Sequence, residues 1–473
     1  MTDLQQTLDR IKSRWMVGGS AVDQASPELK AVADLADIPD LALLAVAAQA
    51  GQVAFRPAPA VGLTPLPVLP RLGLPVLPER HRPAFRRFFK LSKISTDEAN
   101  LLLQFLACRG YTVHPADYMP ARFDDLPPCY GPWEGWGDQE SRTLKVELGE
   151  DSWDDFPPAE RVNALRELRQ RDGTAARDLI AAKVVSMPAE QRFKVIAVLE
   201  TGLHQDDTAF LERLRQNDRS AKVQALAAAF LARLGAVLDE AESAKELADF
   251  LEVGNKGLIN RKTTVKTRKL KTGAQKARRT ELFETVSLPG LAEALGVAEE
   301  ALVSSWQFGN FREDSEFCGL VARTGAIPLV SALTDRVLSD TSASAETLHA
   351  LLDRLGPEDK WQRLPALLEK DPSVLPTAMR CAGDNLGRLG LRTLASSHFL
   401  KALLKSAGDQ AADTAKTNQS AHFQTQLFQL GLLADQEAAQ NLVQSFIQAD
   451  MSRSDPALLM LQFNAALAPG VSS

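Results

Sequence analysis

The sequence predicts an all-α protein, organised as an α-solenoid of stacked helix pairs with long irregular Pro-rich loops. An apolar helical pattern returns about every thirty residues between positions 162 and 234, which is typical of stacked helix pairs. Ala and Leu dominate a composition with 45% hydrophobic but only 6% aromatic residues, which favours helices over β-sandwiches. A chain of 473 residues is long enough for two or three domains with buried cores.

The repeat rests on three apolar positions that return along the chain. The first set recurs at an offset of 31 residues and then of 30: Val162, Leu165 and Leu168; Phe193, Ile196 and Leu199; Val223, Leu226 and Ala229. The clearest helix follows Asp218, where apolar residues form an unbroken stripe. We expect Ser220 to cap this helix and Gly235 to end it, and Asp206 or Asp207 to cap the preceding one.

The N-terminal region, residues 1–109, is expected to hold helices separated by a Pro-rich spacer at about 57–83. Proline fixes φ and has no N–H, so the Leu-Pro alternation from Leu63 to Pro78 should lie extended. It can pack on the protein's own helices, which we favour, or dock on an aromatic-lined partner groove. Helices should resume from Pro83 to Arg109.

Residues 110–157 are predicted to be irregular, because proline is frequent there and acidic side chains greatly outnumber basic ones. One short strand is conceivable at 142–148. Trp133 and Trp136 are candidate interaction residues, since Trp is favoured at binding hot spots. The favoured alternative is that the tryptophans anchor the segment to the first helices of the solenoid. The carboxylates lack the spacing of a calcium loop, so no metal is expected.

Residues 153–235, which include most of the HEAT-like repeat block predicted at 158–252, resemble a known family. The runs PAERVNALRELRQRD, PAEQRFKVIAVLETGLHQDDTAFLERL and DRSAKVQALAAAFLARLG are similar to the core of a bacterial HEAT-like family of unknown function. Its members tend to be encoded beside MoxR-type AAA ATPases, von Willebrand factor A domain proteins and SWIM zinc-finger proteins. The resemblance implies HEAT-like helix pairs and such a neighbourhood, but no reaction.

A basic loop is predicted at 253–280, where ten of the 54 basic residues fall within 28 positions that contain no acidic residue. It can be a solvated loop lying on the protein's own acidic surface, a site for an acidic protein, or a nucleic-acid site that neutralises phosphates. Its basic residues are Lys256, Arg261, Lys262, Lys266, Arg268, Lys269, Lys271, Lys276, Arg278 and Arg279. The segment has no aromatic residue for base stacking.

Residues 281–473 are expected to form a second helical array, in which helical patterns punctuated by Gly and Pro include 291–302 and 321–338. The six histidines are scattered, and none pairs locally with a Ser or Cys in a nucleophile motif. We therefore expect a non-enzymatic protein without a cofactor. Four widely separated cysteines and the lack of a secretory signal favour the cytoplasm.

These observations lead to two functional hypotheses. The first is a scaffold or adaptor that binds a protein, with a MoxR-type ATPase or von Willebrand A domain protein as the partner that the resemblance implies. The alternative is nucleic-acid binding through residues 256–279. No membrane association is expected, because the most apolar stretch, at 41–55, is shorter than a membrane span.

Overall fold

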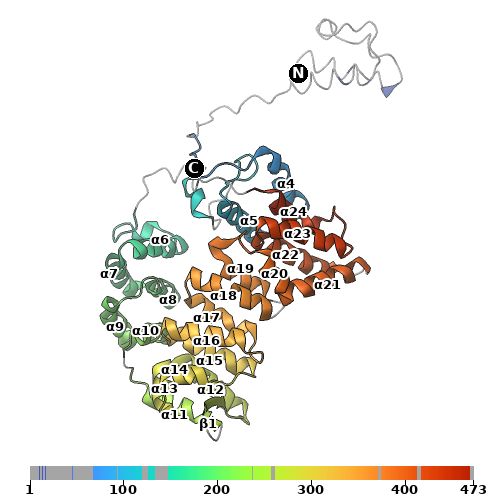
Figure 1. Cartoon of the computed structure of the whole chain (residues 1–473). Coiled ribbons are helices and arrows are strands. Elements are labelled where there is room, and N and C mark those ends of the chain that lie inside the picture. The colour runs from blue at the N-terminus through green and yellow to red at the C-terminus, as the bar shows by residue number, and fades with distance from the viewer. Residues whose placement is uncertain are drawn as a thin grey trace. The chain divides into compact units, whose positions relative to one another are not determined.

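The computed structural model describes residues 68–468 apart from 93, 120–125, 134–146, 237, 257–261, 371–373 and 413–416, and the isolated positions Arg10, Ser13, Met16, Val17 and Ala45. The chain divides into two units, Met1–Val68 and Leu69–Ser473, and the second contains nearly all of the described residues. Its described residues are mostly helical, which confirms the all-α prediction (Figure 1). The helices expected within residues 1–55 and most of the Leu-Pro alternation lie outside the described residues.

The first helices of this unit pack against the last ones. They are η3 Glu79–His81, α4 Arg82–Arg87, η4 Phe88–Ser92 and α5 Thr96–Cys108. Helix α4 contacts α24 (Leu459–Ala466), and α5 contacts α22 (Thr417–Leu433). Phe88 lies edge-to-face against Phe428 and Phe463, with centroids 6.0 and 5.5 Å away. Residues early and late in this unit therefore share one hydrophobic core.

The end of the Pro-rich spacer lies on the protein's own surface. Leu77 N–H donates to the carbonyl of Thr112 at 2.7 Å, and Thr112 N–H donates to the carbonyl of Pro75 at 2.8 Å. The Leu77 side chain is only 2% exposed. Leu77 therefore agrees with the favoured interpretation that the aliphatic side chains of the spacer pack on the chain's own helices, whereas Val68 and Val76 are 92% and 44% exposed.

The predicted repeat block forms a run of helices with its own hydrophobic core. Its helices are α6 Pro158–Arg171, α7 Gly173–Lys183, α8 Ala189–Ala197, α9 Thr208–Asn217 and α10 Ala221–Arg233. Helix α6 contacts α7 and α8, and α10 contacts α8 and α9. Leu165, Ile196 and Val223, one from each predicted set, are all buried in this core. The recurring apolar positions therefore face one another inside the block.

The helix ends in this block follow the expectations only in part. Gly235, with φ of +79°, stands in the left-handed region just after α10, where it ends the helix as predicted. Ser220 and Asp207 precede α10 and α9 without accepting a capping hydrogen bond from them. The Asp207 carboxylate binds Arg169 instead, since a buried guanidinium must be paired.

The chain continues through a hairpin into a long series of helices. These elements are α11 Ala241–Asp249, β1 Leu251–Lys256, β2 Lys262–Thr267, α12 Gly273–Thr285, α13 Leu288–Leu295, α14 Glu299–Ser305, α15 Phe311–Thr324, α16 Ile327–Ser339, η11 Ala345–Thr347, α17 Leu348–Arg354, α18 Pro357–Lys370, α19 Leu375–Ala382, α20 Leu391–Ser396, α21 His398–Ala412, α22 Thr417–Leu433, α23 Gln436–Gln448 and α24 Leu459–Ala466. Strands β1 and β2 pair antiparallel with Leu251 opposite Thr267, and they form the one sheet within the described ranges.

Two helical patterns that were expected to be continuous are each broken by a glycine. The pattern at 291–302 divides into α13 and α14 at Gly296, whose φ of +66° suits glycine. The pattern at 321–338 divides into α15 and α16 at Gly325, where a Cβ would lie 2.6 Å from the Val321 carbonyl oxygen. Pro328, in the first turn of α16, has no N–H and therefore suits a helix start.

Basic side chains in the last turns of several helices bind the C-terminal end of an earlier helix. Arg336, at the end of α16, donates to the carbonyls of Val303 and Trp306 at the end of α14. Arg354, at the end of α17, donates to the carbonyl of Ala322 near the end of α15. The last carbonyls of a helix lack partners within it and carry partial negative charge, so guanidinium groups stabilise them.

The same type of contact recurs further along the chain. Lys370, in the last turn of α18, donates to the carbonyl of Asp340, just after α16, at 2.7 Å. Asn464 of α24 donates to the carbonyl of Gly431 in α22 at 2.9 Å. The joined residues are 30 to 33 positions apart in each case. We call these contacts C-terminal clamps; each places the ends of two alternate helices side by side.

Candidate functional site

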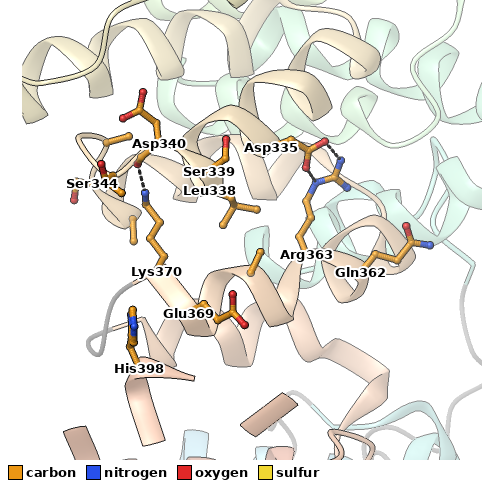
Figure 2. A pocket seen from close by; sticks show the side chains of 14 residues that line it. Asp335, Leu338, Ser339, Asp340, Ser344, Gln362, Arg363, Glu369, Lys370 and His398 are labelled. Atoms are coloured by element: carbon orange, nitrogen blue, oxygen red, sulfur yellow. Dashed lines mark hydrogen bonds and ion pairs between the residues drawn. The ribbon is translucent and has the colours of Figure 1, made fainter. Parts of the chain in front are cut away.

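An open groove lies between α16, the turn that follows it, α18 and the start of α21. Its volume is about 610 Å³, and we call it the α16–α18 groove. Figure 2 shows side chains from these elements converging on it. The lining residues are Asp335, Leu338, Ser339, Asp340, Thr341, Ala343, Ser344, Ala345, Gln362, Arg363, Ala366, Glu369, Lys370 and His398.

Small side chains explain why a hollow remains between two helices that contact each other. Helices α16 and α18 pack together. Ser339 and Ser344 line one side of the groove and Ala366 lines the other, so little side-chain volume fills the space. Leu338 adds an apolar surface to the wall.

Arg363 and Lys370, the two basic side chains that line the groove, are held by partners in its walls. Arg363 binds both carboxylate oxygens of Asp335, with its Nε 2.7 Å from Oδ1 and its Nη2 3.0 Å from Oδ2 (Figure 2). Arg363 Nη2 also donates to Ser331 Oγ at 2.5 Å. The Lys370 clamp to the Asp340 carbonyl closes another side. A bidentate pair of this kind fixes the directions of its donors and acceptors.

The rest of the lining combines polar, charged and apolar groups. Glu369, His398 and Gln362 are exposed residues of the lining. Three carboxylates, two basic side chains and one histidine stand next to alanine and leucine surfaces. Such a mixed surface suits polypeptide, which offers backbone N–H and C=O groups together with apolar side chains.

The predicted basic loop at 253–280 is not a loop throughout. Residues 251–256 and 262–267 form the β1–β2 hairpin, and Gly273–Thr285 form α12. The loop prediction was wrong because Thr263, Thr264 and Val265 form a β-branched run that pairs with β1. Thr272 caps α12, accepting from Gln275 N–H in a capping box.

Several of the ten basic side chains bind the protein's own carboxylates. Arg279 is 2% exposed and pairs with Glu313 at 2.9 Å and Glu316 at 3.1 Å. Arg278 pairs with Glu246, which holds the pKa of that exposed carboxyl below its ordinary value. This arrangement agrees with the interpretation that part of the segment lies on the protein's own acidic surface.

Of the remaining basic residues, one forms an ion pair across the hairpin, others are exposed, and the rest are not fully described. Lys266 pairs across the hairpin with Glu252 at 3.1 Å, and both side chains are about half exposed. Lys269, Lys271 and Lys276 are exposed, and so is Arg268, whose Nε donates to the Leu251 carbonyl at 2.9 Å. Arg261 and the side chains of Lys256 and Lys262 lie outside the described residues.

Of the two candidate tryptophans, the structure describes Trp133, and Trp136 lies outside the described residues. Trp133 ends η5 Pro128–Trp133, is 6% exposed, and donates from its indole nitrogen to the Pro70 carbonyl at 2.7 Å. It stacks edge-to-face on Tyr130. Trp133 is therefore an anchor within the core shared by the first and last helices, whereas Trp153 packs in the core of the α6–α10 block.

The thiols lie in surroundings that disfavour the thiolate. Burial raises the pKa of Cys318 to about 12 and that of Cys381 to about 11. Cys381 lines a space of only about 10 Å³ beside His349, which hydrogen-bonds to Thr377 at 2.9 Å. Among the described residues, no three His, Cys, Asp or Glu side chains gather as metal ligands.

The sequence did not reveal the α16–α18 groove. Its walls come from residues between 335 and 398, and neither the small side chains nor the paired charges form a recognisable motif. The one available signal was the helical pattern at 321–338, whose second part belongs to α16, the helix that packs on α18. That these two helices contact each other, and through which residues, follows only from the fold.

The described residues form a mostly helical protein with an open groove between the alternate helices α16 and α18. Nothing in the described helices has both the length and the apolar character of a membrane span. The model of a family of unknown function, DUF5691, matches residues 133–446, and the chain belongs to this family. Neither a curated protein nor a solved structure matches the chain.

Proposed function

We propose that this chain is a non-enzymatic helical-repeat scaffold, an α-solenoid of HEAT-like helix pairs that binds a protein partner. The C-terminal clamps support this architecture because they join alternate helices at a separation of 30 to 33 residues. Arg323 of α15 makes a similar contact with the end of α12, but across 37 to 40 residues. The separation of the clamps agrees with the offset of the apolar sets between 162 and 234. Packing of α6 on α8, α14 on α16 and α22 on α24 follows the same alternate order. Stacked repeats present extended surfaces to partners.

The partner binds in the α16–α18 groove, and the groove is the single observation that carries this assignment. At about 610 Å³ it is large enough for several side chains of a peptide segment. Its fixed Asp335–Arg363 pair and clamped Lys370 provide oriented hydrogen-bonding groups beside Leu338. Small residues on both sides keep the groove open without an induced rearrangement.

The family neighbourhood that the resemblance implies suggests a first partner to test. A MoxR-type ATPase, or the von Willebrand A domain protein that works with it, would make this chain an adaptor or substrate-recruiting subunit. The test is capture of the purified ATPase by the immobilised full chain, with and without nucleotide. Failure of capture in every buffer contradicts this partner.

A groove-filling substitution tests the binding site itself. Ala366→Trp places a large side chain into the groove, and we expect capture to fall by about tenfold or more because the partner segment is displaced. Ala350→Trp is the matched control, because Ala350 is an exposed alanine on α17 outside the groove. Equal capture by both variants, with unchanged helicity by circular dichroism, contradicts the assignment.

Nucleic-acid binding through residues 256–279 is the weaker alternative. The carboxylate pairs of Arg278 and Arg279 leave fewer positive charges for phosphate. A phosphate binder should lose orders of magnitude in affinity for a labelled duplex between about 50 mM and 200 mM salt. Replacing Lys266, Arg268, Lys269 and Lys271 by Ser should then abolish the signal. An undetectable or salt-independent signal excludes this alternative.

A further inference from the structure

The β1–β2 hairpin has one covered edge and one open edge. Beyond β2, the N–H of Gln307 donates to the Val265 carbonyl at 2.8 Å, and Val265 bridges to Trp306. Beyond β1, the described residues provide no further strand, since β1 and β2 are the only members of this sheet. The free edge of the hairpin is therefore the outer edge of β1.

The register shows which backbone groups point to that edge. In an antiparallel pair, hydrogen-bonded and non-hydrogen-bonded positions alternate, and residues at the latter direct both N–H and C=O outward. The Arg268 N–H donates to the Phe250 carbonyl at 2.8 Å, so position 250 is hydrogen-bonded to β2, and so are 252 and 254. The outward groups of β1 therefore belong to Leu251, Val253 and Asn255.

The hydrogen bond from Gln307 N–H independently confirms which positions of the hairpin point outward. Val265 stands opposite Val253, and its carbonyl points away from β1. At the start of β1, the outward Leu251 carbonyl is occupied by Arg268 Nε. The same alternation directs the N–H and C=O of Val253 and the N–H of Asn255 outward. No described group bonds to these three groups.

The open part of the edge carries one exposed apolar side chain, exposed basic residues follow β2 along the chain, and Glu252 of β1 is paired with Lys266. Val253 is 48% exposed and is one of the large hydrophobic side chains that are exposed among the described residues. Arg268 lies at the same edge, where its Nε bond to Leu251 leaves both terminal nitrogens of an exposed guanidinium for another acceptor. Lys269 and Lys271 follow directly and are exposed. β1 has no proline or bulge at this point to prevent pairing.

From these observations we infer that the outer edge of β1 is a docking site for an extended, acidic segment of a protein partner, which adds a strand to the hairpin. Backbone groups of that segment pair with Val253 and Asn255, and its carboxylates bind Arg268, Lys269 and Lys271. The positive charge selects an acidic occupant, whereas a second copy of this chain would bring two basic edges together. This site is separate from the α16–α18 groove and does not depend on it.

A substitution at one outward N–H tests the backbone pairing. In Val253→Pro the lost N–H is one that does not bond to β2, so the hairpin ladder keeps its own hydrogen bonds. The probe is a fluorescent peptide of alternating Glu and Val, about six residues long, the usual strand length. We expect Val253→Pro to weaken binding of this peptide about tenfold or more, whereas Val253→Thr, which keeps the N–H, should not.

A second variant keeps the test decisive if proline disturbs the hairpin. Reversing the charge in the double variant Lys269→Glu and Lys271→Glu leaves both strands unchanged, and we expect it to weaken binding of the acidic peptide at low salt. A peptide of alternating Lys and Val should bind more weakly than the acidic one to the native chain. Ala366→Trp should leave binding at β1 unchanged, which separates this inference from the groove assignment.

Hydrogen exchange on the full chain reports the edge directly. The amides of Val253 and Asn255 should exchange more slowly when the acidic peptide is added, whereas those of Glu252 and Gly254, already bonded to β2, serve as internal controls. Unchanged exchange at 253 and 255 overturns the inference. If exchange at 253 and 255 slows when only the concentration of the chain itself is raised, the occupant is a second copy. If a DNA duplex slows exchange and the peptide does not, the occupant is a nucleic acid. Either result overturns the acidic partner.

Discussion

At the residue scale, paired arginines hold the helices of this chain together. Arg169 is a buried example: it donates to the carbonyls of Thr201 at 2.9 Å, Gly202 at 3.0 Å and Gly173 at 2.6 Å. Its guanidinium also binds both carboxylate oxygens of Asp207, and the two side chains are 2% and 1% exposed. The sequence offered Asp207 only as a helix cap, because its buried partner lies 38 positions away.

Removing one partner of this pair should destabilise the α6–α10 block. Asp207→Ala leaves a buried guanidinium without its carboxylate, and we expect the free energy of unfolding to fall by about 3–5 kcal/mol. Asp206→Ala is the control, because the neighbouring Asp206 side chain is 69% exposed; its effect should stay within about 1 kcal/mol. Denaturant unfolding followed by circular dichroism measures both. Equal losses would contradict the assigned role of Asp207.

A second carboxylate gives a pH-dependent prediction. Hydrogen bonds from Arg82 and Arg86 hold the pKa of Asp117 below its ordinary value of 3.8. A carboxylate whose pKa is lowered by folding stabilises the folded state at pH values above its unfolded-state pKa. This stabilisation is lost as the pH falls through the folded-state pKa. The stability difference between the native chain and Asp117→Asn should therefore be larger at about pH 6 than at about pH 3. A difference independent of pH would contradict this origin.

At the element scale, apolar periodicity predicted helices better than it predicted their breaks. The α10 stripe and its end at Gly235 followed from local spacing. The breaks at Gly296 and Gly325 were missed because apolar residues continue on both sides of each glycine. The β1–β2 hairpin was missed because its charged residues hid the β-branched run. Contacts across the fold, which a single sequence does not show, decide these cases.

The C-terminal clamps are testable one at a time. Arg336→Met keeps an aliphatic side chain but leaves the carbonyls of Val303 and Trp306 without their donor, so we expect a loss of about 1–3 kcal/mol. Arg392→Met, at an exposed arginine on α20, should cost less than about 0.5 kcal/mol. Thermal or urea unfolding compares the two. A neutral Arg336→Met would show that the clamp contributes no stability.

At the scale of the whole molecule, the helical class predicted from the sequence is confirmed, and the thirty-residue repeat between 162 and 234 stays a prediction. The sequence did not predict that α4 and α5 pack on α24 and α22, because the contacting residues are hundreds of positions apart. It also did not locate the groove between α16 and α18. Contacts between distant segments determine both features.

One measurement tests the proposed repeat architecture most directly: native-state hydrogen exchange on the Arg336→Met variant. In a stack of repeats each unit contacts its neighbours, so we predict faster exchange in α14 and α16 and in the adjacent α15, α17 and α18. Exchange in α6–α8 and α23–α24 should remain as in the native chain. A uniform increase through every described helix would contradict the scaffold account.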